Sequence, residues 1–467
     1  MKRNESLDIL RGLAILAMVL SGSIAFHILP GWMYHAQVPP PDHKFDANLP
    51  GITWVDLVFP FFLFAMGAAI PLSLHKRFQS GEEKWKIALH IIYRYAMLVF
   101  FAIFTQHARA WVIAKEPAAS DYILSIGCFI LLFFIYTDLK KSAGKMLAVS
   151  LRVLAILLAL VFFYFNEFSN GNGFDFYRSD IIIVVLANMA LFGSFVWWIT
   201  KDKPVLRIGM LPFIMAVFLA STIKESWNEK LYNFTLLPWA YKFYYLKYLF
   251  IILPGTLAGE WMLKRSSLTV VKESNHHTLW LMLALLGLAL VITNTTFLYT
   301  RKVELNLFIT IPGVITMLFF LQKFKSSDAI FEYRKKIIEA GCYLVLLGLF
   351  FEAYEGGIKK DYSTYSYYFV TSGLAFFILL WLDVFSSRKG WSSILNYFGT
   401  VGKNPMVAYV AGNLLLIPLL NLTGAIRLFD YMLDHGQLLG FFRGIIFTGI
   451  VSLITYGFVK MKWFWKT

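Results

Sequence analysis

Charged residues are scarce in this sequence. Of its 467 residues, 15% are Asp, Glu, Lys or Arg, whereas 58% are hydrophobic and 18% are aromatic. Soluble domains carry about 25% charged residues, so a chain of this length and composition cannot cover its own surface with polar groups. This scarcity argues against a soluble enzyme and predicts a protein embedded in a membrane.

Cysteine is rare as well. The two cysteines, Cys128 and Cys342, each lie within an apolar run. Two isolated cysteines supply neither a disulfide framework nor a cysteine-rich metal site. We interpret both as packing residues that face the membrane or the protein core.

Long apolar runs, in contrast, follow one another through almost the whole chain, and a run of about 17 to 25 residues can cross a bilayer as a helix. They predict spans at residues 8–29, 53–74, 87–106, 122–138, 146–166, 179–199, 208–223, 246–263, 278–297, 305–322, 336–354, 366–384, 403–421 and 439–461. Because the runs at 122–138 and 208–223 are short, we expect an all-α, polytopic transmembrane helix bundle of about 11–14 spans. No segment is polar enough for a separate soluble domain, so residues 1–467 are expected to form a single membrane domain.

Basic residues predict the orientation of the chain. The formal net charge of +15 would suggest a nucleic-acid partner in a soluble protein, but most Lys and Arg residues here occur in short clusters between apolar runs. If the N-terminus lies in the cytoplasm and the loops alternate, most of these clusters are cytoplasmic, as the positive-inside rule expects. We therefore expect both termini in the cytoplasm, a lipid bilayer as partner and no nucleic acid.

Polar residues in or beside membrane spans are costly and commonly functional, so the search for a site starts with them. The first run opens with Ser6, Asp8, Arg11 and Gly12. Ser6 can cap the helix, and Asp8 and Arg11 share a helix face and can pair. Two interpretations stay open: a capped helix start with a neutralised arginine, or an arginine that holds an anionic group of a cytoplasmic cofactor.

The segment between the first two spans is rich in histidine. It contains His27, His35 and His43, three of the nine histidines of the chain, and Asp56 lies at the start of the next apolar run. An aspartate in this position can complement the positive end of a helix, or it can orient a histidine that acts as general base. A metal site is a third interpretation, but zinc-like HxxxH or HxH spacing is absent, and no metal is expected.

Three segments carry a resemblance to a known family. They are Ser-Leu-Asp-x-x-Arg-Gly at residues 6–12, Gly-Ile-Thr-Trp-Val-Asp-Leu-Val-Phe-Pro-Phe-Phe-Leu-Phe-Ala-Met-Gly at residues 51–67, and Gly-x-x-Gly-Lys-Asn-Pro-Met-x-x-Tyr at residues 399–409. With a Trp/Tyr-rich segment ending in His between the first two, they resemble the heparan-α-glucosaminide N-acetyltransferase family and its bacterial relatives. The resemblance is strong over residues 6–75 and weaker beyond them.

The resemblance implies a multi-pass acyltransferase of a bacterial inner membrane. Members of that family move an acetyl group from cytoplasmic acetyl-CoA to an amino sugar on the far side of the membrane, so acetyl-CoA is the expected co-substrate and a sugar or glycan the expected acceptor. The family's active-site histidine follows aromatic residues after the first helix, which makes His35 its counterpart. His43 is the runner-up, because residues 38–50 are an insertion. Gly22 stands where the mammalian enzyme has a functional asparagine.

The chemistry of acyl transfer fits these residues. Transfer from a thioester to an amine or hydroxyl needs a base that takes a proton from the acceptor, and histidine titrates in the right range. We predict His35, oriented by Asp56, as this base or as a covalent acyl carrier, with His43 as the alternative. The tetrahedral intermediate carries an oxyanion that needs hydrogen-bond donors. The candidate donors are Ser21, Ser23, Trp32, Tyr34 and Asn404.

The acetyl-CoA phosphates need basic or polar groups on the cytoplasmic side. The candidates are Arg11 with its neighbour Asp8, and Lys403 with Asn404. The glycines around Lys403 do not have the spacing of a phosphate loop, and Asn replaces the required Ser or Thr, so an NTPase is rejected.

Two other functions stay open. A secondary transporter or channel would use buried charges for substrate or proton passage, but such proteins commonly show paired repeats with broken helices, and no matching halves are visible here. The polar residues are instead concentrated in residues 6–56. A sugar O-acetyltransferase is the second alternative, which differs only in the acceptor. The sequence is compatible with a homodimer.

Overall fold

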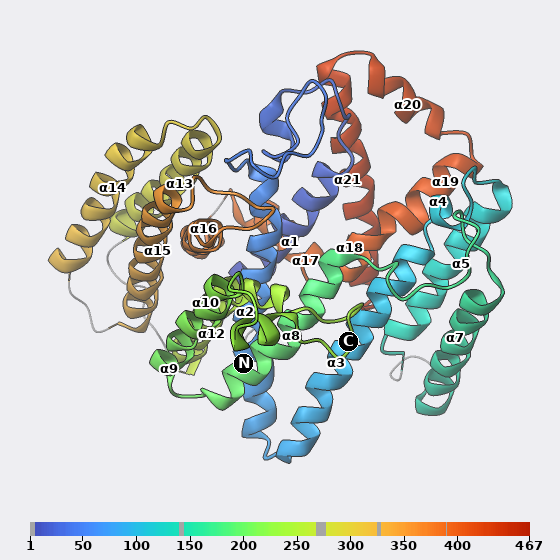
Figure 1. The fold of residues 1–467 in the computed structure, drawn as a ribbon, viewed down its shortest axis with the longest axis horizontal. Helices are drawn as coiled ribbons and strands as arrows, with labels where there is room; N and C mark the ends of the chain where they lie inside the picture. Colours follow the sequence, from blue (N-terminus) through green and yellow to red (C-terminus); the bar gives the residue numbers. More distant parts are fainter. Residues whose placement is uncertain (1–4, 140–143, 268–276, 325–327, 389) are drawn as a thin grey trace.

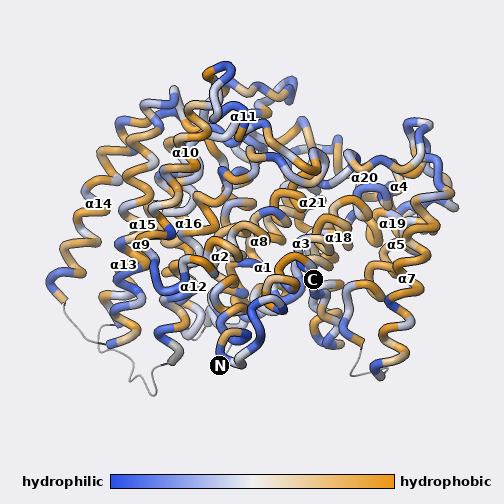
Figure 2. The backbone as a smooth tube through the Cα atoms, turned by 60° about the horizontal axis from the view of Figure 1, so that its bottom comes forward, coloured by the Kyte–Doolittle hydropathy of each residue, from blue (hydrophilic) through white to orange (hydrophobic). Residues whose placement is uncertain are grey.

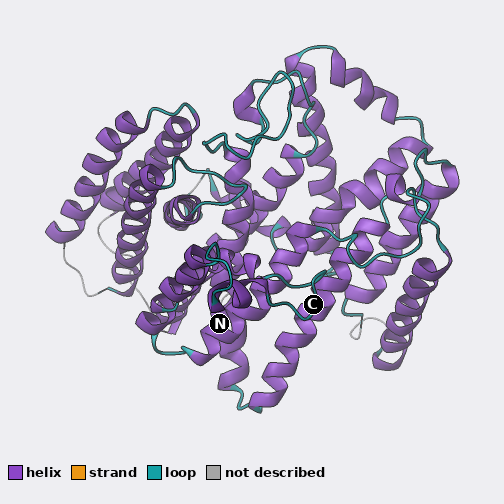
Figure 3. Ribbon diagram, in the orientation of Figure 1, coloured by secondary structure: helices purple, strands orange, loops and turns teal. Residues whose placement is uncertain are grey.

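The computed structural model describes residues 5–139, 144–267, 277–324, 328–388 and 390–467, and within them it contains helices and no β-strand (Figures 1 and 3). The predicted all-α fold is therefore confirmed. The elements are α1 (Glu5–Ser21), η1 (Gly31–Met33), α2 (Trp54–Gln79), α3 (Lys84–His107), α4 (Ala110–Ile113), α5 (Ala119–Tyr136), α7 (Lys145–Phe165), α8 (Ile181–Ile199), α9 (Pro204–Gly209), α10 (Leu211–Ala220), α11 (Trp227–Asn233), η2 (Phe243–Tyr248), α12 (Leu249–Ser267), α13 (His277–Tyr299), α14 (Val303–Lys323), α15 (Ala329–Tyr354), α16 (Tyr365–Phe385), α17 (Ser392–Val401), α18 (Pro405–Ala411), η3 (Gly412–Leu416), α19 (Ile417–Leu422), α20 (Ile426–Asp434) and α21 (Gln437–Lys460).

Among the described residues, 12 helical segments are long and apolar enough to cross a membrane. This number lies within the predicted range and confirms a polytopic bundle. The short predicted run at 122–138 is one of the 12, as α5, whereas the run at 208–223 is represented by a shorter apolar stretch, Pro204–Ala220. Figure 2 shows hydrophobic residues along the helices and hydrophilic residues mainly in the segments that join their ends.

The first helix ends earlier than the hydropathy predicts. α1 stops at Ser21, so the predicted span 8–29 is wrong at its C-terminal end. The hydroxyl groups of Ser21 and Ser23 donate back to the carbonyl oxygens of Met18 (2.9 Å) and Val19 (2.8 Å), which closes the last turn. The apolar residues that follow pack in a loop against the protein, where the N–H of Ala25 donates to the carbonyl of Gly440 on α21 at 3.1 Å.

Helix α16 lies inside the bundle, and α7 and α14 lie at its edges (Figure 1). In its most apolar window 89% of α16 is buried within the protein, compared with 22% for each of α7 and α14. Apolar side chains on the outer helices, such as Leu157 and Phe308, are exposed. A helix that is apolar all round and exposed at the rim suits a lipid environment.

Helices α2 and α12 approach each other closely, because glycines line the contact. A Cβ atom placed on Gly255 would lie 2.5 Å from the carbonyl oxygen of Phe64, and one on Gly259 would lie 2.2 Å from that of Ala68. Small residues four apart let transmembrane helices pack backbone to backbone. This contact anchors α2, whose first turn carries Asp56.

The first turns of α1 and the C-terminal residues lie at the same end of the bundle. Near the C-terminus, the N–H of Trp465 donates to Oδ1 of Asn404 at 3.1 Å. Two residues before Asn404, Gly402 packs against the backbone of Asp8, in the first turns of α1. The contacts place residues near both termini at one end of the bundle; that both termini lie in the cytoplasm stays a prediction.

Candidate functional site

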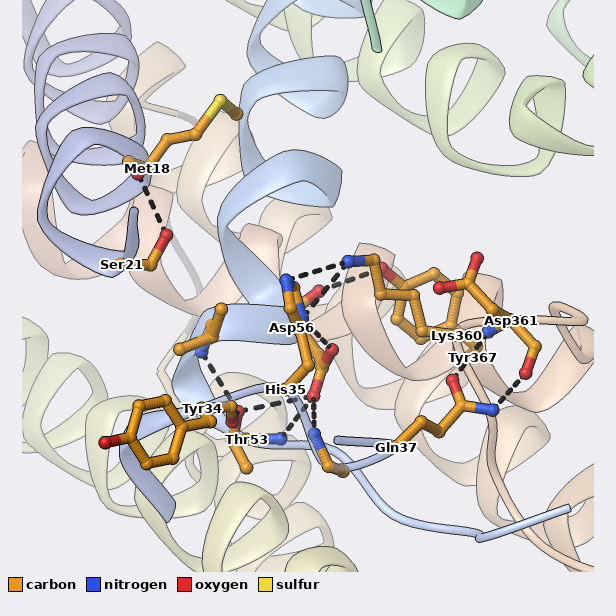
Figure 4. A network of polar contacts seen from close by, with 12 residues as sticks. Met18, Ser21, Tyr34, His35, Gln37, Thr53, Asp56, Lys360, Asp361 and Tyr367 are labelled. Carbon is orange, nitrogen blue, oxygen red and sulfur yellow. Dashed lines mark hydrogen bonds and ion pairs between the residues drawn. The ribbon is translucent and has the colours of Figure 1, made fainter. Parts of the chain in front are cut away.

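His35 and Asp56 form the centre of a polar network (Figure 4). His35 follows the end of α1 and Asp56 lies in the first turn of α2, so the network is at the end of the bundle opposite the start of α1. Nδ1 of His35 lies 2.7 Å from Oδ1 of Asp56. The Asp56 side chain is 2% exposed, whereas that of His35 is 41% exposed. The structure thus brings together the histidine and the aspartate that the sequence singled out, and it leaves the imidazole accessible.

Local sequence explains how Asp56 is held. Thr53 caps α2, and Asp56 stands at the third helical position, so the two form a capping box. Oδ2 of Asp56 accepts from the N–H groups of Thr53 (2.9 Å) and Ala36 (3.1 Å). The Thr53 hydroxyl donates to the carbonyl of Tyr34 at 2.6 Å. The same cap therefore fixes the carboxylate and the backbone on both sides of His35.

The carboxylate also determines the state of the imidazole. A carboxylate held by backbone N–H donors can only accept a hydrogen bond, so Nδ1 of His35 carries the proton that points to Asp56. The lone pair of Nε2 then lies in the ring plane and is free to take a proton or to attack a carbonyl carbon. This is the geometry that a histidine general base or nucleophile requires.

Lys360 is a third member of the site, and the sequence analysis missed it. Its Nζ atom lies 3.1 Å from Nδ1 and 3.3 Å from Nε2 of His35. An ammonium group at nearly equal distances from both nitrogens cannot lie in the ring plane without overlapping the ring carbons. Lys360 therefore stands over the face of the imidazole. One signal could have found it: Lys359 and Lys360 lie in a segment that the predicted topology places outside, where the positive-inside rule disfavours lysine.

The segment that carries Lys360, residues 355–364 between α15 and α16, is bound to the histidine loop. The side chain of Gln37 donates to the carbonyl of Asp361 and accepts from its N–H at 2.8 Å. The N–H of Gly51 donates to the carbonyl of Ile358 at 2.7 Å. On α16, the Tyr367 hydroxyl donates to the carbonyl of Asp56 at 2.8 Å. Contacts across most of the chain length thus assemble the site.

The same segment is held from its other side at Ser363. Nζ of Lys247 donates to the carbonyl of Ser363 at 3.1 Å. The Ser363 hydroxyl lies 3.1 Å from that of Tyr244 and 2.6 Å from that of Tyr368. A segment tied down at Asp361 and at Ser363 has little freedom to move Lys360.

His43, the runner-up for the base, is not at the dyad. Its side chain is buried, and its ring packs against those of Phe26, His27 and Tyr34, with centroid distances of 4.5, 4.8 and 4.6 Å. Neither ring nitrogen has a hydrogen-bond partner among the described residues. Burial, aided by the nearby His27, lowers the pKa of His43. The loop folds back on itself here, which separates His43 from Asp56.

The predicted cofactor residues lie at the opposite end, where two of the recognised motifs meet. Arg11 pairs with Asp8. A Cβ on Gly12 would lie 1.9 Å from the carbonyl oxygen of Phe398, and one on Gly402 would lie 1.9 Å from that of Asp8. Glycine is thus required on both sides of the crossing between α1 and α17. Because Gly12 follows Arg11 and Gly402 precedes Lys403, the crossing brings the backbone at Arg11 close to the backbone at Lys403.

Asn404 has a structural role. It is fully buried; its Nδ2 donates to the carbonyl of Trp463 at 2.9 Å, and its Oδ1 accepts from the N–H of Trp465. These bonds pin the C-terminal tail. The amide of Asn404 is therefore engaged by the protein backbone, which removes it from the residues we assign to a cofactor.

Arg94 of α3 extends the basic region near Arg11. The two guanidinium groups lie within electrostatic range of each other, and His90, one turn earlier, is within range of Arg94 and Arg77. Among the described residues Arg94 makes no ion pair with a carboxylate. Arg94 therefore lies near a second cation, Arg11, and neighbouring cations are suited to an anion that bears several charges.

Comparison with known families gives a match that covers the first part of the chain. The model of a family described as Domain of unknown function (DUF5009) matches residues 3–262, which is more than half of the chain and includes His35, Asp56 and Arg11. No curated protein matches the chain. Within the described residues, no group of three or more His, Cys, Asp or Glu side chains is placed to hold a metal ion.

Proposed function

We propose that this protein, which belongs to the DUF5009 family, is an integral membrane acyltransferase. It moves an acetyl group from cytoplasmic acetyl-CoA to an amino or hydroxyl group of a sugar on the other side of a bacterial inner membrane. The observation that carries the proposal is the His35–Asp56 pair, with Nδ1 committed to a buried carboxylate and Nε2 open, at the membrane end opposite the basic cluster around Arg11.

In the direct route, His35 acts as general base. Nε2 removes a proton from the acceptor while the acceptor nitrogen or oxygen attacks the thioester carbonyl carbon. The C=O electron pair moves to oxygen, and the tetrahedral intermediate collapses with release of the CoA thiolate. The thiolate takes the proton from His35, which returns to its starting state. Asp56 holds the ring in position and stabilises the imidazolium between the two proton transfers.

In the covalent route, His35 carries the acyl group. Nε2 attacks the thioester carbon, and the thiolate leaves. The acceptor then attacks the resulting acyl-imidazole, the bond between the acyl carbon and Nε2 breaks, and the acceptor's proton passes to the thiolate. Both routes use the same open nitrogen. They differ in one measurement: only the covalent route exchanges acetyl groups between acetyl-CoA and labelled CoA when no acceptor is present.

The two ends of the molecule are within reach of one extended donor. Arg11 and Ser21 are separated along α1 by about 15 Å, since a helix rises about 1.5 Å per residue. The histidine loop begins directly after Ser21 and packs onto the protein, with Tyr34 and Gln37 buried beside His35. This packing supports a donor whose phosphates sit near Arg11 and whose thioester points toward the loop.

The test uses the full chain purified in detergent, with acetyl-CoA as donor and glucosamine as probe acceptor. We expect His35→Ala to reduce acetyl transfer by about 10²–10⁴-fold, the contribution typical of a positioned acid–base group. His435→Ala is the matched control, because His435 is exposed, follows the end of α20 and, among the described residues, bonds to the carbonyl of Tyr431 in that helix. Full activity in the His35 variant would contradict the proposal.

The natural acceptor needs a second measurement. Envelope glycans from cells with and without the gene are compared by mass spectrometry. A difference of one acetyl group identifies both the acyl chain and the acceptor. If purified protein binds no CoA and the glycans are identical, a transporter becomes the better account.

A further inference from the structure

Lys360 is the cation that the structure places against the ring of His35. Its Nζ lies 3.1 and 3.3 Å from the two ring nitrogens, over the ring face. A group in this position borders the space in front of Nε2, where the acceptor atom and the acyl carbon meet during transfer. The Lys360 ammonium is therefore a near neighbour of the carbonyl oxygen of that acyl group.

No carboxylate neutralises Lys360 directly. Among the described residues, none lies within ion-pair distance of its Nζ. The nearby Asp56 carboxylate is instead engaged by His35 and by the N–H groups of Thr53 and Ala36. A half-buried ammonium without a direct counter-charge has the capacity to stabilise a negative oxygen that forms beside it.

The backbone at Lys360 is also fixed in position before any substrate binds. Its neighbour Asp361 is bonded in both directions to Gln37, and Ser363 is bonded to Lys247 and Tyr244. A charge that is already in position costs no reorganisation when the transition state forms. This preorganisation is the main source of electrostatic catalysis in enzymes.

Four donors that the sequence suggested for the oxyanion are directed elsewhere. The hydroxyls of Ser21 and Ser23 donate to carbonyls within α1 and its last turn. The Tyr34 hydroxyl donates to the carbonyl of Ala25 at 2.7 Å. Asn404 lies at the other end of the bundle, in the contact that pins the C-terminal tail. Lys360 thus occupies the role that these residues leave open.

We propose that the ammonium group of Lys360 stabilises the oxyanion that forms on the acyl carbonyl oxygen at His35. The inference rests on the proposed acyl transfer. As the acceptor atom bonds to the carbonyl carbon, the C=O electron pair moves to oxygen beside Nζ, while Nε2 of His35 holds the acceptor's proton. When the C–S bond breaks, the pair returns, the carbonyl re-forms and the thiolate takes that proton. Lys360 keeps its own proton throughout.

The experiment compares Lys360→Met and Lys360→Arg, assayed with acetyl-CoA and glucosamine and, with water as acceptor, by acetyl-CoA hydrolysis. We expect Lys360→Met to lower kcat by about 10²–10³-fold, as loss of an oxyanion donor does, with little change in either KM. Arginine retains the charge and is expected to recover part of the rate. Lys359→Met removes the same charge one residue away and is expected to be neutral.

The pH–rate profile separates catalysis from simple positioning. If Lys360 acted only by repelling a proton from His35, Lys360→Met would shift the acidic limb of the profile to higher pH and leave the plateau unchanged. A lowered plateau is the result that the proposal expects. Thermal unfolding of each variant shows whether a loss of rate reflects a loss of folded protein.

Three outcomes would overturn the inference. An unchanged kcat with a raised KM for the acceptor would make Lys360 a binding residue for an anionic acceptor. An unchanged rate in Lys360→Met, with His35→Ala inactive, would remove Lys360 and leave the proposed function standing. A wild-type protein without transfer, hydrolysis or acetyl exchange would remove both.

Discussion

Gln37 and Asp361 are 324 positions apart in the chain, yet each bonds the other in both directions. The Gln37 amide nitrogen donates to the Asp361 carbonyl, and the Asp361 N–H donates to the Gln37 amide oxygen at 2.8 Å. Gln37 follows His35 by two residues, and Asp361 follows Lys360 directly. This pair therefore sets the position of one reactive group against the other, and it is the first place to test how rigid the site must be.

Replacing Gln37 tests that dependence. Gln37→Leu keeps the size of the side chain but leaves the Asp361 N–H without its partner, which is expected to cost about 1–3 kcal/mol of stability. We expect kcat to fall as well, because Lys360 loses its fixed position over His35. Thermal unfolding and acetyl transfer are measured side by side, with Gln79→Leu at an exposed position as control. A destabilised variant with a normal kcat would mean that the pair is only structural.

Asp56→Asn tests the tautomer of His35. The amide fills the same space but offers an N–H where the carboxylate accepted, so it favours the ring with the proton on Nε2. The base would then be blocked, and we expect a fall in kcat of about 10⁴-fold at most, with folding preserved. Asp121→Asn is the matched control: Asp121 is also a first-turn aspartate, and it accepts from the N–H of Ala118 at 2.8 Å. If both variants changed kcat and stability equally, Asp56 would act only as a helix cap.

The dyad could be predicted from sequence because its parts lie close together along the chain. Asp56 opens an apolar helix, His35 precedes it in a proline-containing loop, and few other histidines compete. Lys360 belongs to no motif and reaches the site through tertiary packing, since its ring contact spans 325 positions. Hydropathy likewise predicted the helices well, because the bilayer imposes their length. It missed the end of α1, where apolar residues continue past Ser21 but pack against protein.

His43 gives the protein a pH-dependent stability. Its folded-state pKa is lowered below the ordinary value of 6.5, because the ring is buried and faces His27, Phe26 and Tyr34. The unfolded chain then binds a proton more readily than the folded one, so stability is complete above about pH 6.5 and falls as the pH decreases below it. We expect Tm to fall between about pH 6.5 and 5 in wild type and to fall less in His43→Phe.

The control for this measurement is His435→Phe, since His435 is exposed. That variant should keep the pH dependence of wild type. If His43→Phe and wild type lose stability in parallel, another group is responsible for the acid sensitivity.

Gly402→Ala tests the crossing of α1 and α17. The new methyl group would lie 1.9 Å from the Asp8 carbonyl oxygen, so the helices must separate. Overpacking of this kind is expected to cost about 1–3 kcal/mol or more. Gly457→Ala in α21 meets nothing within 4 Å and should leave stability unchanged or slightly raised. Unfolding temperatures in detergent decide the comparison, and equal values for the two variants would contradict the close contact.

The last prediction concerns the end of the bundle where α1 and α17 cross, which we propose binds acetyl-CoA. Arg11, Arg94 and Lys403 lie at the end of the bundle that holds both termini, and a polyphosphate is the anion that suits them. We expect Arg94→Met and Lys403→Met to weaken CoA binding by about 10–100-fold, since a hydrogen bond to a charged group contributes about 1.5–3 kcal/mol. Arg11→Ala should weaken it too, and it also removes the ion pair between Arg11 and the buried Asp8.

Calorimetry is done with CoA and with pantetheine, which lacks the nucleotide phosphates. The comparison distinguishes a loss of phosphate binding from a general disruption of the binding site. The substitutions should weaken CoA binding and leave pantetheine binding unchanged, and higher salt should reduce the difference. Lys323→Met, at the end of the peripheral helix α14, is the charge-matched control. Unchanged CoA affinity in all three site variants would place the donor elsewhere. Equal losses for CoA and pantetheine would mean that these residues maintain the fold of this end and do not contact phosphate.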